Sequence, residues 1–112
     1  MCGSGLQLDY FDSNPTIDDI NAMISENDVM VFSKSYCGFS LAVKRLLDKN
    51  DISYSVLEMN LDPYGQTVKH LLHDITDQWT SPNVFIHGQH IGGYTDTAAL
   101  GSAELLNLVN NN

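Results

Sequence analysis

Apolar and polar residues follow one another along the chain with spacings that alternate between those of helices and those of strands. Apolar residues recur at helical spacing over 16–27, and Thr16, followed three positions later by Asp19, resembles the capping box that starts a helix. The run at 29–32 is short, apolar and bounded by polar residues, which favours a buried strand. The sequence therefore predicts a first helix followed by a first strand.

The segment after Cys37 predicts a second helix. Its apolar residues follow the i, i+3, i+4, i+7, i+8 pattern of a helix that packs on one side. They are Phe39, Ala42, Val43, Leu46 and Leu47. The helix should end near Asn50, and residues 53–57 then alternate as a strand does. Cys37 is therefore expected at the N-terminus of a helix, in the loop that follows the first strand.

A third helix and a hairpin are predicted in the second half of the chain. Asp62 and Pro63 indicate the start of the helix, with the aspartate as its cap and the proline in its first turn. The runs at 83–87 and 90–91 flank Gly88-Gln89, a glycine-led two-residue connection typical of a tight hairpin. These two runs are predicted to form an antiparallel pair.

The remaining segments complete one domain. Residues 95–109 predict one or two closing helices, and the asparagines at 110–112 are expected to form a frayed tail. Residues 1–14 are expected to be a flexible lead to a single domain over 15–109. The order helix, strand, helix, strand, helix, hairpin, helix predicts an α/β protein with a four-stranded mixed sheet flanked by helices, which resembles the thioredoxin-like fold.

Composition and charge narrow the classes of function. A chain of 112 residues with 43% hydrophobic content is sufficient for one globular core. The formal charge of -9 repels the phosphate backbone of nucleic acids, so no nucleic-acid partner is expected. No apolar run approaches the roughly 20 residues that cross a bilayer, so no membrane partner is expected.

Cysteine usage indicates a reducing compartment. The two cysteines are Cys2 and Cys37, whereas small secreted domains stapled by disulfides usually carry more. The N-terminal residues have neither the apolar core of a secretory signal nor the arginine-rich pattern of an organellar one. A cytoplasmic location is expected, with Cys2 either a disordered thiol or an artefactual or regulatory disulfide partner.

Cys37 is the candidate reactive group. Thiols react as thiolates, and the unpaired N–H groups and dipole of a helix N-terminus lower the pKa of a thiol placed there. Lys34 adds a positive charge three residues upstream, and no carboxylate occurs between Lys34 and Leu47. The alternative is a buried, inert cysteine. The position after a strand and before a helix favours reactivity.

Two motifs resemble those of glutaredoxins. KSYCGFS at residues 34–40 is similar to their active-site loop, and TSPNVFIHGQHIGGYTD at 80–96 is similar to their cis-proline segment and glutathione-binding turn. The resemblance covers most of residues 16–109 and implies that Cys37 is a nucleophile in a glutathione-dependent oxidoreductase. It also implies that Lys34 pairs with a glutathione carboxylate.

The resemblance further implies a glutathione-binding site around this thiol. Ser81 would offer its backbone N–H and C=O to the tripeptide beside a cis Pro82, and Asp96 would meet the γ-glutamyl ammonium. Trp79 stands where active relatives often have a basic residue, and Gln78 could partly replace that anchor. The implied glutathione-binding residues are Lys34, Tyr36, Phe39, Gln78, Thr80, Ser81, Pro82, Gly93, Thr95 and Asp96.

Ser40 replaces the second cysteine of dithiol glutaredoxins, so no disulfide can form across this motif. The implied mechanism is monothiol: Cys37 attacks a glutathionylated protein, the protein thiol leaves, and a second glutathione resolves the adduct. The expected partners are glutathione and proteins that are glutathionylated or contain disulfides. The enzyme is expected to be a monomer.

Other functions remain open at this point. The Cys-Gly-Phe-Ser tetrad is also the signature of glutaredoxins that carry a [2Fe–2S] cluster between two subunits, which would make Cys37 a metal ligand in a homodimer. The short spacing from Lys34 to Cys37 favours the enzyme. A redox-inactive interaction domain is a third possibility.

Some side chains near these motifs have two interpretations. Tyr36 and Phe39 could form an exposed platform beside the thiol, although the spacing of Phe39 also fits core packing. Histidines occur in two pairs that are conceivable metal ligands, but with two ligands a pair, solvated or capping histidines are favoured. They are His70 with His73 and His87 with His90.

Overall fold

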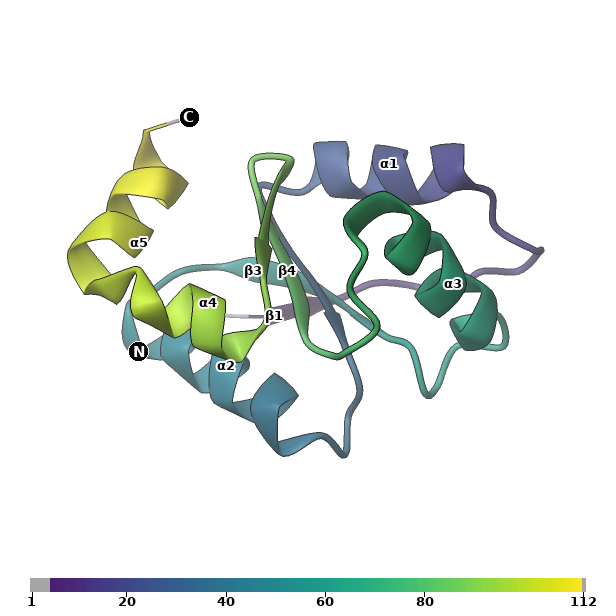
Figure 1. Cartoon of the computed structure of the whole chain (residues 1–112), viewed down its shortest axis with the longest axis horizontal. Helices are drawn as coiled ribbons and strands as arrows, with labels where there is room; N and C mark the ends of the chain where they lie inside the picture. The colour runs from purple at the N-terminus through teal and green to yellow at the C-terminus, as the bar shows by residue number, and fades with distance from the viewer. Residues whose placement is uncertain (1–4, 112) are drawn as a thin grey trace.

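A computed structural model describes residues 5–111, so Cys2 lies outside the described residues. The strands are β1 (Gly5–Gln7), β2 (Val29–Ser33), β3 (Tyr54–Glu58), β4 (Asn83–Ile86) and β5 (Gln89–Gly92). The helices are α1 (Ile17–Glu26), α2 (Gly38–Lys49), α3 (Gly65–Thr76), α4 (Tyr94–Ala99) and α5 (Gly101–Asn110). This is the thioredoxin-like α/β architecture that the order of the elements predicts (Figure 1).

The sheet has the strand order β1-β3-β2-β4-β5. β2 pairs in parallel with β3 and antiparallel with β4, and β4 and β5 form the antiparallel hairpin. The prediction of four strands is corrected to five, because β1 adds to the edge of the sheet in parallel with β3. Residues 5–7 therefore belong to the domain and not to the flexible lead expected over 1–14.

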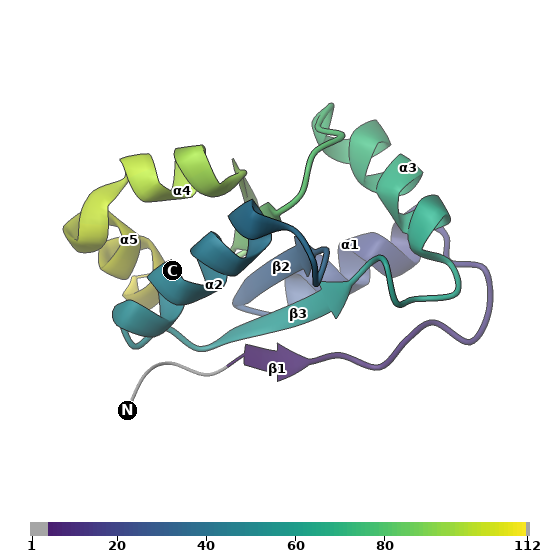
Figure 2. The same cartoon turned by 90° about the horizontal axis from the view of Figure 1, so that it is seen from below.

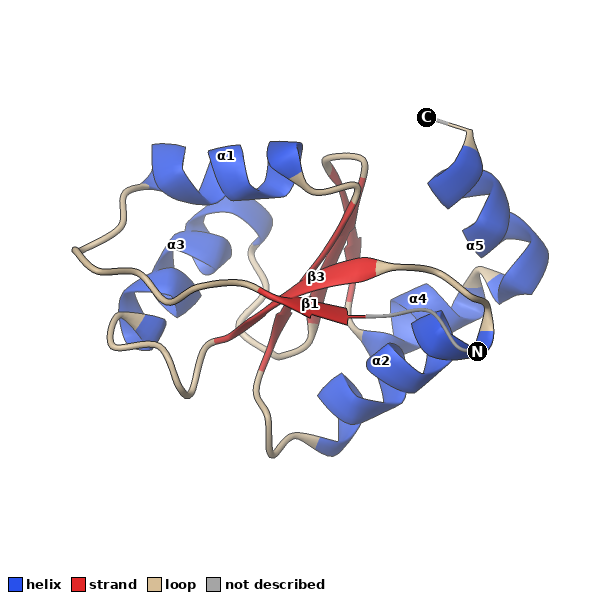
Figure 3. Cartoon of the chain, turned by 180° about the vertical axis from the view of Figure 1, so that it is seen from behind, coloured by secondary structure: helices blue, strands red, loops and turns tan. Residues whose placement is uncertain are grey.

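Helices cover both faces of the sheet. α1 and α3 lie on one side, and α2, α4 and α5 lie on the other (Figures 1 and 3). The alternation of side chains along β2 explains the two layers, because Met30 and Phe32 pack with α1 and α3, whereas Val29 and Val31 pack with α2 and α5. Both faces are buried, which is why β2 reads as a continuous apolar run.

Local capping determines where α1 starts. The Asp19 N–H donates to Thr16 Oγ1 at 3.3 Å, and the Thr16 N–H donates back to Asp19 Oδ2 at 2.8 Å. This reciprocal pair is the capping box expected from the sequence.

No helix within residues 5–111 combines the length and the apolar character needed to cross a bilayer.

The predicted start of the third helix at Asp62-Pro63 is wrong. The Asp62 carboxylate accepts hydrogen bonds from the N–H groups of Phe11 at 3.0 Å and Tyr64 at 2.8 Å, so it joins the N-terminal segment to the loop before α3. The helix begins at Gly65, where a Cβ atom would lie 1.8 Å from the Met59 carbonyl oxygen. Glycine permits this close approach of the loop to the helix.

The hairpin turn lies one residue earlier than predicted. Ile86 pairs with Gln89, so the connection is His87-Gly88 and Gln89 is the first residue of β5. His87 and Gly88 have φ values of 47° and 80°, and two central residues with positive φ define the primed turn that suits a two-residue hairpin. At the C-terminus, the closing segment forms two helices, and Asn110 belongs to α5 and not to the tail.

Candidate functional site

Cys37 occupies the N-cap position of α2, so it lies at a helix N-terminus as the sequence predicts. Its N–H donates to the Lys34 carbonyl oxygen at 3.0 Å, and its own carbonyl oxygen accepts from the Leu41 N–H at 3.0 Å. The loop and the first turn of the helix therefore fix the backbone on both sides of the thiol. Gly38, the next residue, has no atom within 4 Å of where a Cβ would stand, so the space beside the first residue of α2 is open.

Hydrogen bonds stabilise the thiolate form of Cys37. Burial of the thiol raises its pKa, but the N–H groups of Ser40 and Phe39 and the side chains of Ser81 and Ser40 lower it, and the resulting pKa lies below the usual value. These N–H groups are the donors that the first turn of a helix leaves without partners. A larger fraction of Cys37 is therefore the reactive anion at neutral pH than for an ordinary thiol.

The thiol lies against the loop before β4. In its protonated form Cys37 Sγ donates to the Ser81 carbonyl oxygen, with 3.7 Å between the two atoms. The Ser81–Pro82 peptide bond is cis, as the resemblance implies. The loop that the sequence assigns to glutathione thus directly borders the thiol, although the two segments are 44 positions apart in the chain.

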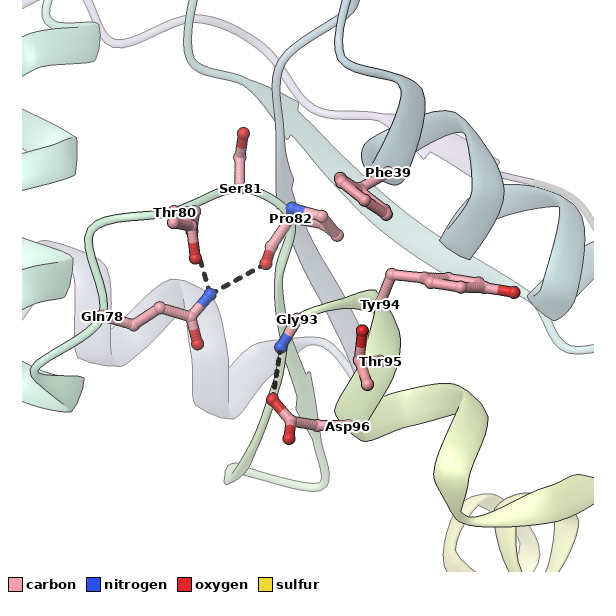
Figure 4. A pocket seen from close by; sticks show the side chains of 9 residues that line it. All are labelled: Phe39, Gln78, Thr80, Ser81, Pro82, Gly93, Tyr94, Thr95 and Asp96. Atoms are coloured by element: carbon pink, nitrogen blue, oxygen red, sulfur yellow. Dashed lines mark hydrogen bonds between the residues drawn. The ribbon is translucent and has the colours of Figure 1, made fainter.

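A pocket of about 370 Å³ opens beside this loop (Figure 4). Its walls come from the start of α2, from the loop before β4 and from the start of α4. The lining residues are Phe39, Gln78, Thr80, Ser81, Pro82, Gly93, Tyr94, Thr95 and Asp96. All but Tyr94 are among the residues implied to bind glutathione, so the structure brings most of the expected site together.

Asp96 has two roles in the geometry of this pocket. Its Oδ2 accepts a hydrogen bond from the Gly93 N–H at 3.1 Å, so Asp96 caps α4. The same carboxylate lines the pocket. Gly92 makes this possible, since a Cβ there would stand 2.3 Å from Asp96 Oδ2, and its φ is +122°. The negative charge is thus held at one end of the pocket.

Gln78 holds the loop before β4 through its side-chain amide. Its Nε2 donates to the carbonyl oxygens of Thr80 and Pro82, both at 2.9 Å (Figure 4). Its Oε1 lies 3.2 Å from His90 Nε2. The amide is therefore occupied by the loop that it holds. Gln78 thus lines the pocket and fixes the loop, and its partial replacement of a basic anchor for glutathione stays a prediction.

A second hollow of about 230 Å³ is lined by two lysines, Lys34 and Lys69. It contains the predicted Lys34 and Tyr36 together with two residues from α3 that the sequence analysis missed, Gln66 and Lys69. These two are three positions apart and so share one face of α3. The spacing of Gln66 and Lys69 can be seen in the sequence. Only the tertiary fold shows that this face of α3 lies beside Lys34.

Trp79 completes the surroundings of Lys69. The Lys69 Nζ lies 5.9 Å from the centre of the Trp79 ring, a distance at which a cation and an aromatic face attract each other. His73 stacks on the same ring, with centroids 3.8 Å apart, and His70 meets it edge-on.

Within residues 5–111, no three His, Cys, Asp or Glu side chains form a group able to hold a metal ion.

The two aromatic residues beside Cys37 are exposed. Phe39 is 63% exposed and stacks on Tyr94 with centroids 6.2 Å apart, so the alternative of core packing for Phe39 is wrong. Tyr36 is 74% exposed.

Ser40, by contrast, is fully buried, and its hydroxyl accepts from the Lys34 N–H at 3.3 Å. Ser40 therefore supports the active-site loop from beneath.

Charges of opposite sign flank the thiol. Lys34 and Lys69 line the hollow on one side, and Asp96 lines the pocket on the other. Cys37 contacts both segments, through its backbone bond to Lys34 and its thiol contact with Ser81. This arrangement suits an elongated ligand with a carboxylate at one end, an ammonium at the other and a sulfur between them.

Comparisons with known proteins show the family of this chain. The glutaredoxin family model matches residues 29–91. A glutaredoxin of Ricinus communis is 44% identical over 77 residues, which cover 69% of this chain and 76% of that protein. The monothiol glutaredoxin-S10 of Oryza sativa subsp. japonica is 39% identical over 84 residues, which cover 74% of this chain. The chain spans about half of that rice protein, since the match covers 51% of it.

Solved structures of similar fold lead to the same family. A buckwheat glutaredoxin–glutathione complex matches with a TM-score of 0.81 and 32% identity, over 84% of this chain and 86% of that chain. The holo form of glutaredoxin C1 from Populus tremula x tremuloides matches with a TM-score of 0.82 and 35% identity, over 85% of this chain and 86% of that chain. Sequence and fold are thus similar to those of the same group of proteins.

Proposed function

Because the chain belongs to the glutaredoxin family, we propose that it reduces glutathione mixed disulfides with Cys37 as its single nucleophile. The observation that carries this proposal is the position of Cys37 at the N-terminus of α2, between a cationic hollow and a pocket that ends in Asp96. The lowered pKa of the Cys37 thiol favours this enzyme over a redox-inactive interaction domain.

The charges around the thiol support a defined orientation for glutathione. Its glycine carboxylate would lie in the hollow with Lys34 and Lys69, and its γ-glutamyl ammonium would meet Asp96. The cysteinyl part would lie along the backbone of Ser81, beside the cis Pro82. The glutathione complex of the buckwheat relative, at 32% identity, supports the same ligand.

The proposed reaction is two successive thiol–disulfide exchanges. The Cys37 thiolate attacks the glutathione sulfur of a glutathionylated protein, a disulfide forms between Cys37 and glutathione, and the protein leaves as a thiolate that takes up a proton. A second glutathione thiolate then attacks the glutathione sulfur of this adduct. The products are glutathione disulfide and the regenerated Cys37 thiolate, so two electrons pass from glutathione to the substrate.

Ser40 supports the monothiol form of this reaction. It occupies the position from which a second cysteine would attack the adduct, and its hydroxyl is bonded within the loop. Resolution must then come from free glutathione. The same hydroxyl helps to lower the pKa of Cys37, so the serine still contributes to the reactivity of the thiol.

The test is the reduction of a small glutathione mixed disulfide, coupled to glutathione reductase and its nicotinamide cofactor. Turnover should require Cys37 and disappear in Cys37→Ser. The matched control is Cys2→Ser, which removes the other thiol of the chain and should leave turnover unchanged. Equal turnover in Cys37→Ser and the parent protein would refute the proposal.

The [2Fe–2S] alternative stays a prediction from the resemblance. A [2Fe–2S] cluster takes four ligands, commonly cysteine thiolates, and the described residues offer one thiolate, that of the half-buried Cys37. Two chains and two glutathiones would therefore be needed to complete the set. Anaerobic reconstitution with iron, sulfide and glutathione tests this role, because a carrier would turn brown, dimerise, and lose both properties in Cys37→Ser.

A further inference from the structure

Positive charge is concentrated on one helix of an acidic protein. The chain has 14 acidic and 5 basic residues. Three of the basic residues, Lys44, Arg45 and Lys49, lie on α2, and Asp48 is the single acidic residue of that helix. α1, on the opposite side of the sheet, carries acidic residues and no basic ones (Figure 2). The molecule is therefore electrically polarised, with its basic helix starting at the reactive thiol.

The exposed side of α2 forms a stripe that runs from Cys37 along the helix. Leu41 is the first residue of the stripe, one turn from Cys37, and its side chain is 45% exposed. Arg45 and Lys49 follow at intervals of four residues and are exposed, so all three share one face. We call Leu41, Arg45 and Lys49 the α2 stripe. The opposite side of the helix packs on the sheet.

The two charges of the α2 stripe have no carboxylate partner within residues 5–111. The neighbouring Lys44 is bonded to Glu58, with 2.5 Å between Nζ and Oε2. Asp48 interacts with Tyr54, whose pKa is raised to about 12 by burial and by this carboxylate. Arg45 and Lys49 are thus left to solvent in a chain with a large excess of acidic groups.

We propose that the α2 stripe binds an acidic segment of the glutathionylated protein substrate, next to the cysteine that is being reduced. The inference rests on the proposed function and adds a class of substrate to it. Charge complementarity identifies the partner, since the two unpaired charges of the α2 stripe attract an acidic segment, whereas the chain as a whole carries a formal charge of -9. Leu41 offers an apolar contact between the thiol and the two charges.

The geometry of the helix predicts where the acidic residues lie in such a substrate. Arg45 is eight residues after Cys37, which corresponds to about 12 Å along the helix. An extended peptide covers about 3.3 Å per residue, so about four residues separate the target cysteine from the acidic positions. Acidic residues at three to six positions from the cysteine should therefore increase the rate.

Two synthetic peptides test the proposal. Both carry one glutathionylated cysteine and differ only at four to five positions from it, where one has glutamates and the other lysines. The variant is Arg45→Gln/Lys49→Gln, and the matched control is Asn21→Glu/Ser102→Glu, which changes net charge equally at exposed positions on α1 and α5. A small glutathione mixed disulfide with an uncharged leaving thiol reports the basal activity of every variant.

The parent protein should prefer the acidic peptide in kcat/KM by about five- to tenfold at low ionic strength, as two exposed charge pairs allow, and added salt should weaken the preference. Arg45→Gln/Lys49→Gln should bring the ratio close to one while basal activity stays unchanged, and the control should keep the parent ratio. A parent ratio near one, or equal losses in variant and control, would overturn the inference.

Two further outcomes are distinguishable. If the parent protein fails on the small mixed disulfide as well, the proposed function fails and not the stripe alone. If sedimentation shows a dimer of the parent protein that Arg45→Gln/Lys49→Gln separates into monomers, the α2 stripe binds a second copy of this chain, which also overturns the inference.

Discussion

Replacing Gln78 by glutamate keeps the size of the side chain but removes both of its hydrogen-bond donors. In the structure, Gln78 Nε2 donates to the carbonyl oxygens of Thr80 and Pro82, each at 2.9 Å. A carboxylate at this position would face two acceptors and could donate to neither. The loop that borders Cys37 should therefore lose its internal support.

The magnitude follows from the two bonds. A typical intramolecular hydrogen bond contributes about 0.5–1.5 kcal/mol, and the bond to Thr80 is exposed, so Gln78→Glu should cost about 1.5 kcal/mol of unfolding free energy. For a domain of this size that corresponds to a fall in Tm of roughly 6–9 °C. Because the proposed binding mode places glutathione along the backbone of Ser81 in this loop, the KM for a glutathionylated substrate should rise more than kcat falls.

Thermal unfolding and steady-state kinetics measure the two effects. Gln89→Glu is the matched control, since it makes the same chemical change at an exposed residue of the same domain, at the start of β5. If Gln78→Glu has the Tm and KM of Gln89→Glu, the role assigned to the Gln78 amide is refuted.

Three further predictions concern the thiol and its surroundings. Ser40→Ala removes a donor that lowers the pKa of Cys37, so alkylation of the thiol at neutral pH should slow by about fivefold and its pH profile should move to higher pH; an unchanged profile would contradict the role of the hydroxyl. Lys69→Met removes one cation from the hollow and should raise the KM for the glutathionylated substrate by about two- to fivefold with kcat unchanged, whereas an equal fall in kcat would argue against a binding role. Gly92→Ala places a Cβ 2.3 Å from Asp96 Oδ2 at a φ of +122° and should destabilise the domain by about 1–3 kcal/mol in urea unfolding, whereas Gly38→Ala, with open space, is its control.

Local signals made the catalytic loop predictable from the sequence. The capping box at Thr16 and the apolar spacing after Cys37 depend on contacts within a few residues, and α1 and α2 start and end close to where they were expected. The position of Cys37 at a helix N-terminus follows from the same short-range pattern. The cis Pro82 and the position of Asp96 at the pocket were instead implied by the resemblance of the motif at 80–96 to glutaredoxins.

The features that the sequence analysis missed depend on long-range contacts. β1 has three exposed residues and no apolar alternation, so only its pairing with β3 defines it as a strand. Asp62 resembles a helix cap locally, but its carboxylate also receives the N–H of Phe11, which is 51 positions away. Lys69 lies on α3, and its place beside Lys34 depends on how that helix packs. The spacing of residues along the chain does not show which distant segments come into contact, so these three features could not be predicted from it.

Transfer of glutathione to Cys37 in a single turnover tests the central claim most directly. The reduced protein is mixed with a glutathionylated peptide in the absence of free glutathione, quenched with acid, and analysed by intact mass and peptide mapping. We predict one glutathione bound to Cys37, released peptide thiol in equal amount, and loss of the adduct when glutathione is added. An adduct on Cys2, a disulfide between Cys37 and the peptide itself, or no adduct at all would contradict the account.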